Sequence, residues 1–187
     1  MNIILFGPPG AGKGTQAKHL VEKFKLFHVS TGDLLRNEIR KKSDIGKKIV
    51  NEMNEGKFVS DDIVNELIKD IVIDPQKKEN LIFDGYPRSI SQAKNLDLLL
   101  SNSEQKIDLV IFLNVNKDTI IKRIEKRKII EKRSDDNLET LAKRYDTYMD
   151  TTRPVLDYYS KKPNFHEVDG TLKIDQITAK IEAFLNV

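Results

Sequence analysis

The strongest constraint on the fold lies in the opening stretch of the chain, MNIILFGPPGAGKGT. Its consecutive apolar residues, Ile3 to Phe6, are typical of a buried strand, and a helix with an apolar face follows the glycine-rich turn. The segment from Gly7 to Thr15 has the spacing G-x-x-x-x-G-K-[ST], which defines a phosphate-binding loop, or P-loop. Because glycines allow successive backbone N–H groups to point at phosphate oxygens, this stretch predicts a site for a phosphorylated ligand.

Two side chains of this loop carry the chemistry of phosphate binding. Lys13 supplies a positive charge, and the Thr15 hydroxyl is suited to reach a Mg²⁺ ion bound to the same phosphates. A glycine-rich turn that binds nothing is the alternative, but both the spacing and the strand–turn–helix context favour the P-loop. Since P-loops occur in kinases, motors and switches, the motif predicts a site and leaves the reaction open.

Length and composition restrict the class of protein further. At 187 residues the chain is long enough for one domain with its own core. No apolar run approaches the ~20 residues of a membrane span, and no signal peptide is expected, because the chain enters a predicted strand at its N-terminus. The absence of cysteine excludes disulfides and thiolate metal sites. We therefore expect a cytoplasmic protein that does not bind membranes.

Apolar runs alternate with amphipathic segments along the whole chain. The predicted strands lie at 3–6, 27–30, 81–84, 109–113 and 164–168, with helices between them. Continuous apolar strands are typical of a parallel sheet that is covered on both faces. The predicted fold class is therefore α/β, with three layers (α/β/α) around a five-stranded parallel sheet. The helical excursion at 30–59 is too small for a core of its own and is interpreted as a mobile flap.

Polar residues follow the predicted strands where ligands gather in a parallel sheet. Gly7, Ser30, Asp84 and Asn114 each follow a strand, so their loops are expected at the carboxyl edge. In a P-loop protein, a carboxylate at the position of Asp84 orients Mg²⁺ or its waters. The three histidines (His19, His28 and His166) are expected to be structural or exposed rather than catalytic.

Arginines are a second group of candidate phosphate ligands at this edge. Guanidinium groups bind phosphate through two hydrogen bonds and keep their charge. Six arginines lie in or next to segments expected there, namely Arg36, Arg88, Arg123, Arg127, Arg133 and Arg144. This is more than one bound nucleotide needs. The sequence therefore suggests two phosphorylated ligands that face each other, and phosphoryl transfer between them requires mainly alignment and charge neutralisation.

Four motifs occur in order along the chain: the P-loop followed by Gln16, STGDLLR at 30–36, DGYPR at 84–88 and RSDDN at 133–137. Together they resemble the adenylate kinase family, and the resemblance covers essentially the whole chain. It implies a core (1–29, 60–126 and 138–187), a lobe that binds a nucleoside monophosphate (30–59) and a short lid (127–137). It also implies the reversible transfer ATP + AMP ⇌ 2 ADP.

The resemblance assigns site residues as well. The ATP phosphates are expected at Gly10, Ala11, Gly12, Lys13, Gly14 and Thr15, with Arg123 and Arg127 also contacting ATP and the backbone near Leu172 against its adenine. The AMP pocket is expected to contain Thr31, Arg36, Lys57, Phe58, Val59, Gly85, Tyr86, Pro87, Arg88 and Gln92. Arg133 and Arg144 are expected to clamp phosphates across the gap. The catalytic candidates are Lys13, Asp84, Arg88, Arg123, Arg127, Arg133 and Arg144.

The resemblance further implies Mg²⁺, held by the nucleotide phosphates and water near Thr15 and Asp84 without direct protein ligands. Many bacterial members have a longer lid, often with a four-cysteine zinc site. Only residues 128–136 separate Arg127 from Asn137 here, and the chain has no cysteine, so no zinc is expected. Because so short a lid excludes less water, its arginines are expected to do relatively more of the closing. We expect a monomer.

The nearest alternative is UMP/CMP kinase, which shares the fold, the short lid and an RSDDN run. The pyrimidine enzymes usually have Ala and Asn where this chain has Thr31 and Gln92. A site built to hydrogen-bond one base disfavours a base that leaves its polar groups unpaired. Thr31 and Gln92 therefore favour AMP.

Two other classes are less favoured. A GTPase-type switch would read guanine through N-K-x-D, but NKD at 116–118 is followed by Thr119 where the last Asp should be. A nucleic-acid binder would use the basic segment 117–133, which contains eight Lys or Arg and only three acidic residues. The chain has no Trp and only 7% aromatic residues, with no stacking platform near that segment. No nucleic-acid partner is expected.

Overall fold

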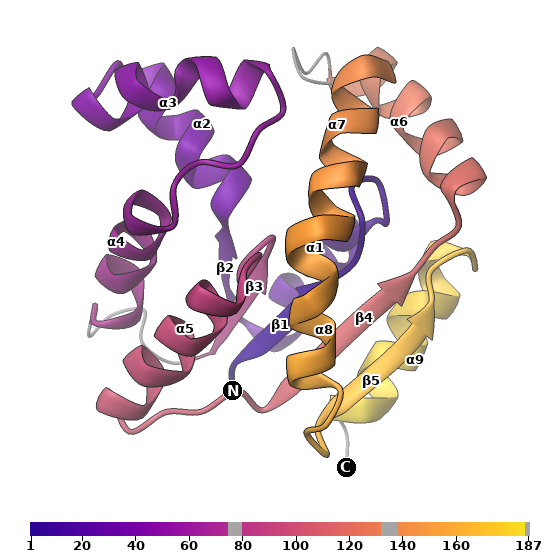
Figure 1. Cartoon of the computed structure of the whole chain (residues 1–187). Helices are drawn as coiled ribbons and strands as arrows, with labels where there is room; N and C mark the ends of the chain where they lie inside the picture. The colour runs from indigo at the N-terminus through magenta and orange to yellow at the C-terminus, as the bar shows by residue number, and fades with distance from the viewer. Residues whose placement is uncertain (75–79, 132–137, 186–187) are drawn as a thin grey trace.

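The computed structural model describes residues 1–74, 80–131 and 138–185, and its centre is a parallel sheet (Figure 1). Its strands are β1 (Ile3–Phe6), β2 (Phe27–Ser30), β3 (Leu81–Asp84), β4 (Leu109–Asn114) and β5 (Phe165–Asp169). All neighbouring strands are parallel, in the order β2-β3-β1-β4-β5. The predicted α/β fold with a five-stranded parallel sheet is confirmed, and the strand before the P-loop is central.

The two faces of the sheet bury alternate residues of the same strand. In β1, Ile4 and Phe6 belong to one core, whereas Ile3 and Leu5 belong to the other. The first core is covered by α4 (Asp61–Val72), α5 (Ile90–Asn102) and α8 (Arg153–Tyr159). The second is covered by α1 (Lys13–Phe24), α6 (Lys117–Glu131) and α9 (Ile174–Leu185). Burial on both faces explains why the strands are continuous apolar runs.

The sequence predicts a helix over 117–127, a cap at Ser60 for the helix that follows it, and a bend or restart of the long helix near Pro154. Helix α6 continues to Glu131, past the predicted end at 127, because residues 128–131 contain no Gly or Pro to stop it. Helix α4 begins at Asp61, but the predicted cap is wrong, since the Ser60 side chain makes no capping hydrogen bond. The restart near Pro154 is confirmed, since a π-helical turn, Tyr148–Thr152, separates α7 (Leu138–Thr147) from α8.

Helices α2 (Thr31–Lys41) and α3 (Asp44–Asn54) form the excursion predicted at 30–59. The Ser30 side chain caps α2 by accepting a hydrogen bond of 3.3 Å from the Asp33 N–H. At the far end of this segment, Gly56 has a φ of 72° and lies against α7. A Cβ on Gly56 would be 2.7 Å from Cγ2 of Thr140, so only glycine allows this close approach. The mobility of the segment stays a prediction.

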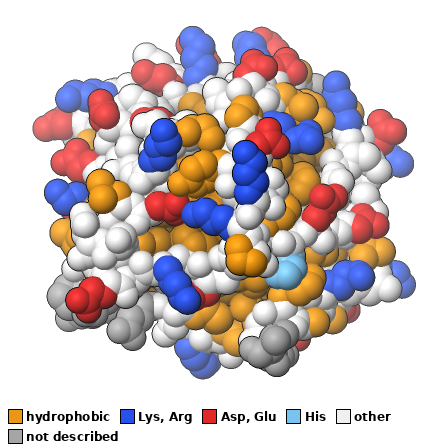
Figure 2. All heavy atoms as spheres, turned by 60° about the horizontal axis from the view of Figure 1, so that its bottom comes forward, with side chains coloured by type: hydrophobic (Ala, Val, Ile, Leu, Met, Phe, Trp, Pro, Cys, Tyr) orange, Lys and Arg blue, Asp and Glu red, His pale blue; other side chains and the backbone are white. Residues whose placement is uncertain are grey.

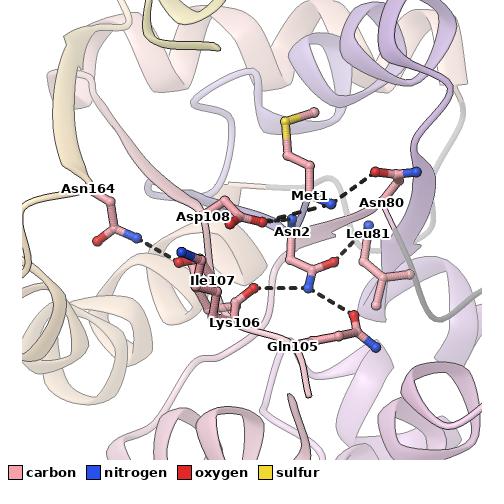
Figure 3. A network of polar contacts seen from close by, with 9 residues as sticks. All are labelled: Met1, Asn2, Asn80, Leu81, Gln105, Lys106, Ile107, Asp108 and Asn164. Carbon is pink, nitrogen blue, oxygen red and sulfur yellow. Dashed lines mark hydrogen bonds and ion pairs between the residues drawn. The ribbon is translucent and has the colours of Figure 1, made fainter. Parts of the chain in front are cut away.

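Asn2 ties the amino edge of the central strand to both of its neighbours (Figure 3). Its Oδ1 accepts a hydrogen bond of 3.1 Å from the Leu81 N–H, at the start of β3. Its Nδ2 donates to Oε1 of Gln105 and to the carbonyl oxygen of Lys106, both at 3.0 Å and both ahead of β4. The Asn2 side chain is only 2% exposed, so these bonds satisfy polar groups that water cannot reach.

The face around this edge carries charges of both signs. Figure 2 shows Lys and Arg side chains scattered among Asp, Glu and apolar side chains, without a continuous basic patch on the side it displays. Across the described residues, no helix is both long enough and apolar enough to span a bilayer.

We predict that Asn2→Ala destabilises the protein by roughly 2–4 kcal/mol, because it leaves the buried Leu81 N–H and Lys106 carbonyl without their partner. Urea denaturation of both proteins measures the difference in unfolding free energy. Lys106→Ala is the matched control, since that exposed side chain is removed while its carbonyl keeps the bond. Equal stability of Asn2→Ala and the wild type would contradict this account.

Candidate functional site

The P-loop connects the central strand β1 to helix α1 at the carboxyl edge of the sheet. Gly12 is the N-cap of α1, and its φ of 95° is a left-handed conformation that favours glycine. The loop is closed by a hydrogen bond of 3.1 Å from the Ala11 N–H to the Pro8 carbonyl oxygen. The first turn of α1 therefore directs backbone N–H groups and the positive end of its dipole at the cleft beside it.

Lys13 folds back over this loop. Its Nζ donates to the carbonyl oxygens of Gly7 (2.7 Å) and Pro8 (3.1 Å). Burial lowers the pKa of Lys13 to about 8; Asp84 opposes this shift, whereas Arg88, Arg144 and Arg127 add to it. The site therefore holds a cation among other cations, and an anion bound there would relieve their repulsion.

Asp84, at the end of β3, is the carboxylate that faces this cluster. Burial raises the pKa of Asp84, but the contact with His28 and the charge of Lys13 together lower it by more than burial raises it. The net shift of the pKa is therefore downward. Nε2 of His28 lies 3.5 Å from Oδ2 of Asp84, within ion-pair distance, but makes no hydrogen bond to it. The sequence predicts His28 to be structural or exposed, whereas the structure places it on the wall of the cleft beside Asp84.

A single cleft of about 590 Å³ joins the P-loop to the arginines. Gly10 to Thr15 and Asp84 line it, as do five of the six predicted arginines: Arg36, Arg88, Arg123, Arg127 and Arg144. These arginines come from α2, the loop after β3, α6 and α7, so the fold collects them from distant segments. Their expected convergence at the carboxyl edge is confirmed. Arg133 lies outside the described residues.

Arg123 links the P-loop to the loop after β5. Its guanidinium donates to the carbonyl oxygens of Ala11 (3.0 Å) and Gly170 (2.7 Å). Burial lowers the pKa of Arg123. This arrangement holds a guanidinium against the mouth of the P-loop without neutralising it.

Arg88 lies deeper, at the junction of the large cleft and a small pocket of about 50 Å³. Its Nε donates to the Gly85 carbonyl oxygen (2.7 Å), and its guanidinium carbon lies 4.8 Å from the centre of the Phe58 ring. Burial, then the charge of Arg144, lowers the pKa of Arg88 to about 10, so the group remains charged at neutral pH. The small pocket is also lined by Pro87, Tyr148 and Thr152.

Gly85 sets the position of two other predicted residues. Its carbonyl oxygen accepts hydrogen bonds from Arg88 Nε and from Thr31 Oγ1, the latter at 2.8 Å. Its φ is 77°, and a Cβ there would lie 2.8 Å from Nη2 of Arg88. A glycine is therefore required for the approach of both side chains.

Some predicted AMP-pocket residues are placed differently from the cleft-lining ones. Val59 and Tyr86 are buried in the core, and the Tyr86 hydroxyl donates to Oδ1 of Asn65 (2.7 Å). Lys57 is exposed and forms an ion pair of 2.6 Å with Glu55. Gln92 is 3% exposed and joins a polar network below the pocket. For these residues the assigned roles stay predictions.

Next to the P-loop, the cleft is lined by apolar residues that the sequence analysis does not select. Leu172 is packed against the core and does not line the cleft, whereas Ile174 and Ile177 of α9 do. Ile174 is 50% exposed, which offers an apolar surface at the mouth of the cleft. The sequence signal that could have identified Ile174 is its position as an apolar residue directly after the DGTLK segment, 169–173.

The NKD run at 116–118 has a structural role in the fold. Asn116 Oδ1 accepts a hydrogen bond of 2.9 Å from the Thr119 N–H, so Asn116 caps the start of α6. The side chain that would read guanine in a GTPase is thus occupied at a helix terminus. This argues against the switch alternative.

Several known proteins are similar to this chain over nearly its whole length. A family model described as adenylate kinase matches residues 5–164. The adenylate kinase of Pelagibacter ubique (strain HTCC1062) is 48% identical, with 100% of both chains aligned. That of Phenylobacterium zucineum (strain HLK1) is 44% identical over 99% of this chain and 97% of the relative. That of Thermosipho melanesiensis is 36% identical over 97% of each chain. Motifs, fold and relatives agree: the chain belongs to the adenylate kinase family.

Proposed function

We propose that the protein transfers a phosphoryl group from Mg-ATP to AMP, giving two ADP, and so balances and salvages adenine nucleotides. The observation that carries this proposal is one cleft that runs from the P-loop to Arg36 on α2, with Arg88, Arg127 and Arg144 also on its wall. A single triphosphate on the P-loop does not need cations that reach α2. A second phosphorylated ligand opposite the first accounts for them.

The chemistry follows from this charge distribution. An oxygen of the AMP phosphate attacks the γ-phosphorus of ATP, the bond from that phosphorus to the bridging oxygen breaks, and ADP leaves on each side. Because the attacking oxygen belongs to an anion, no general base is needed. Lys13 and the arginines offset the repulsion between the two phosphate chains and hold them in line. Arg133 is proposed to join them from the lid, and Leu172 to offer its backbone to the ATP adenine.

Oxygen ligands around the P-loop fit Mg²⁺. Asp84 and Thr15 both line the cleft, and Oδ2 of Asp84 lies 3.4 Å from where a Cβ on Gly14 would be. Among the described residues, no cluster of three or more His, Cys, Asp and Glu side chains is placed to hold a metal ion. We therefore assign Thr15 and Asp84 to orient an ion held mainly by phosphates and water, which would neutralise charge on the transferred group. The zinc-free state stays a prediction.

The acceptor pocket is proposed between α2 and the loop after β3. Thr31, Arg36, Gly85 and Arg88 lie together there, with Phe58 and Pro87 on the wall of the small pocket. Lys57, Val59, Tyr86 and Gln92 are assigned to the same pocket from the family motif. The segments 30–59 and 127–137 are proposed to close over the two nucleotides as lobe and lid, around the core 1–29, 60–126 and 138–187. The protein is proposed to work in the cytoplasm as a monomer.

The test of this function is a monophosphate panel. The purified protein is incubated with Mg-ATP and AMP, UMP, CMP or GMP in turn, and diphosphate formation is followed by chromatography. We expect ADP from AMP and little product from the others, since the relatives all bear the name adenylate kinase. Preferential turnover of UMP or CMP would favour the pyrimidine alternative, and no transfer to any monophosphate would refute the proposal.

The lowered pKa of Lys13 predicts proton uptake when ATP binds. In the free protein Lys13 loses its proton as the pH rises through about 8, and bound phosphates favour the charged form. At a pH well above 8, binding of a non-hydrolysable ATP analogue should take up close to one proton, so affinity should fall as the pH rises. Calorimetry in buffers of different ionisation enthalpy measures this uptake. Lys13→Arg stays charged and should show none; the same uptake in that variant would contradict the assignment.

Arg88 is expected to act on the transferring group. Arg88→Ala should lower kcat by roughly 10³-fold or more, because it removes charge that is needed most in the transition state. Steady-state kinetics with AMP and ATP, and circular dichroism to verify folding, provide the measurement. Arg40→Ala is the matched control, since Arg40 is exposed on α2 and does not line the cleft. A normal kcat with only a raised KM would show that Arg88 merely binds.

A further inference from the structure

The carboxamide of Gln92 is held on both sides by hydrogen bonds. Its Oε1 accepts from the backbone N–H of Arg88 at 2.7 Å. Its Nε2 donates to Oδ1 of Asp61 at 2.7 Å. The side chain is only 3% exposed, so water does not replace these partners easily. Gln92 thus connects the loop that carries Arg88 to the first turn of α4.

Each partner of the Gln92 carboxamide has only one hydrogen-bonding role. A backbone N–H only donates, and an ionised carboxylate only accepts. If the carboxamide turned over, its NH₂ would face the Arg88 N–H and its oxygen would face the Asp61 carboxylate. Both bonds would become repulsive contacts in a buried site. The side-chain amide therefore has one orientation in this structure, fixed by its surroundings.

Asp61 is itself held in place. Its other oxygen, Oδ2, accepts a hydrogen bond of 2.6 Å from Ser89 Oγ, and Ser89 Oγ accepts from the Gln92 N–H at 3.1 Å. Asp61 also lies in the first turn of α4, where a negative charge is stabilised by the helix dipole. Asp61, Ser89 and Gln92 thus form a closed ring of hydrogen bonds between α4 and the start of α5, in which Gln92 takes part through both its carboxamide and its backbone N–H.

We propose that Asp61 is a positioning residue that sets the base specificity of the acceptor site by fixing the orientation of Gln92. The inference rests on the proposed function, in which Gln92 faces the base of the monophosphate. In the observed orientation, one N–H on Nε2 and one lone pair on Oε1 remain available for a ligand. They match adenine, because the N–H can donate to N1 and Oε1 can accept from the 6-amino group. Hypoxanthine offers the reverse, a donor at N1 next to an acceptor at O6, and would need the amide turned over.

The test compares AMP with inosine 5′-monophosphate (IMP), which differs only in those two groups. In Asp61→Asn, the new carboxamide accepts from Nε2 or, turned over, donates to Oε1, so one side of the constraint is lost. We expect the ratio of kcat/KM for AMP to that for IMP to fall about tenfold, the effect of one mispaired buried hydrogen bond. Asp62→Asn is the matched control, because it removes a carboxylate from the same helical turn at an exposed position.

Ser89→Ala provides a second variant, since it removes one of the bonds that hold Asp61. A smaller fall in the same ratio is expected from it. An unchanged ratio in folded Asp61→Asn, with both substrates slowed equally, would show a merely structural role and overturn the inference. The same fall in Asp62→Asn would overturn it too. If the wild type itself does not phosphorylate AMP, the proposed function fails first; wild-type AMP turnover with an unchanged ratio in Asp61→Asn refutes only the role of Asp61.

Discussion

The site depends on the concentration of positive charge at one edge of the sheet. The charges of Arg88 and Arg144 both lower the pKa of Lys13, Arg144 also lowers the pKa of Arg88, and the Asp84 carboxylate opposes these shifts. Such a cluster is unfavourable until anions arrive, because burial has removed much of the water that would screen it. Phosphate binding converts that repulsion into attraction. We infer that the protein uses this stored repulsion to bind two polyanions side by side.

A rigid scaffold is needed to hold like charges together. The central strand β1 is buried on both faces, and Asn2 connects its amino end to the start of β3 and to the segment before β4. The P-loop follows the other end of the same strand. Since β3 lies next to β1, Asp84 is brought beside the P-loop by register alone, with Leu5 opposite Asp84. The stability of the sheet therefore sets the precision of the site.

The acceptor side is built differently, from short polar contacts instead of strands. Gly85 receives both Thr31 and Arg88 on one carbonyl oxygen, and Gln92 is fixed between Arg88 and Asp61. These contacts join α2, α4, α5 and the loop after β3, which are distant in the sequence. A displacement of any one of these elements would therefore shift the guanidinium of Arg88. In the proposed function, these contacts would connect base recognition to the phosphoryl-transfer centre.

The fold class, the P-loop and the carboxyl-edge position of Asp84 could all be predicted from the sequence alone. Those depend on local spacing and on strand patterns, which are readable along the chain. The sequence also predicted the arginine cluster, although only the fold shows that Arg36 and Arg127 share one cleft. Nothing in the sequence indicates that His28 lies beside Asp84 or that Asp61 lies beside Gln92. The two members of each pair are far apart in the chain, and strand pairing and helix packing bring them into contact, so the pairs can be recognised only in the folded structure.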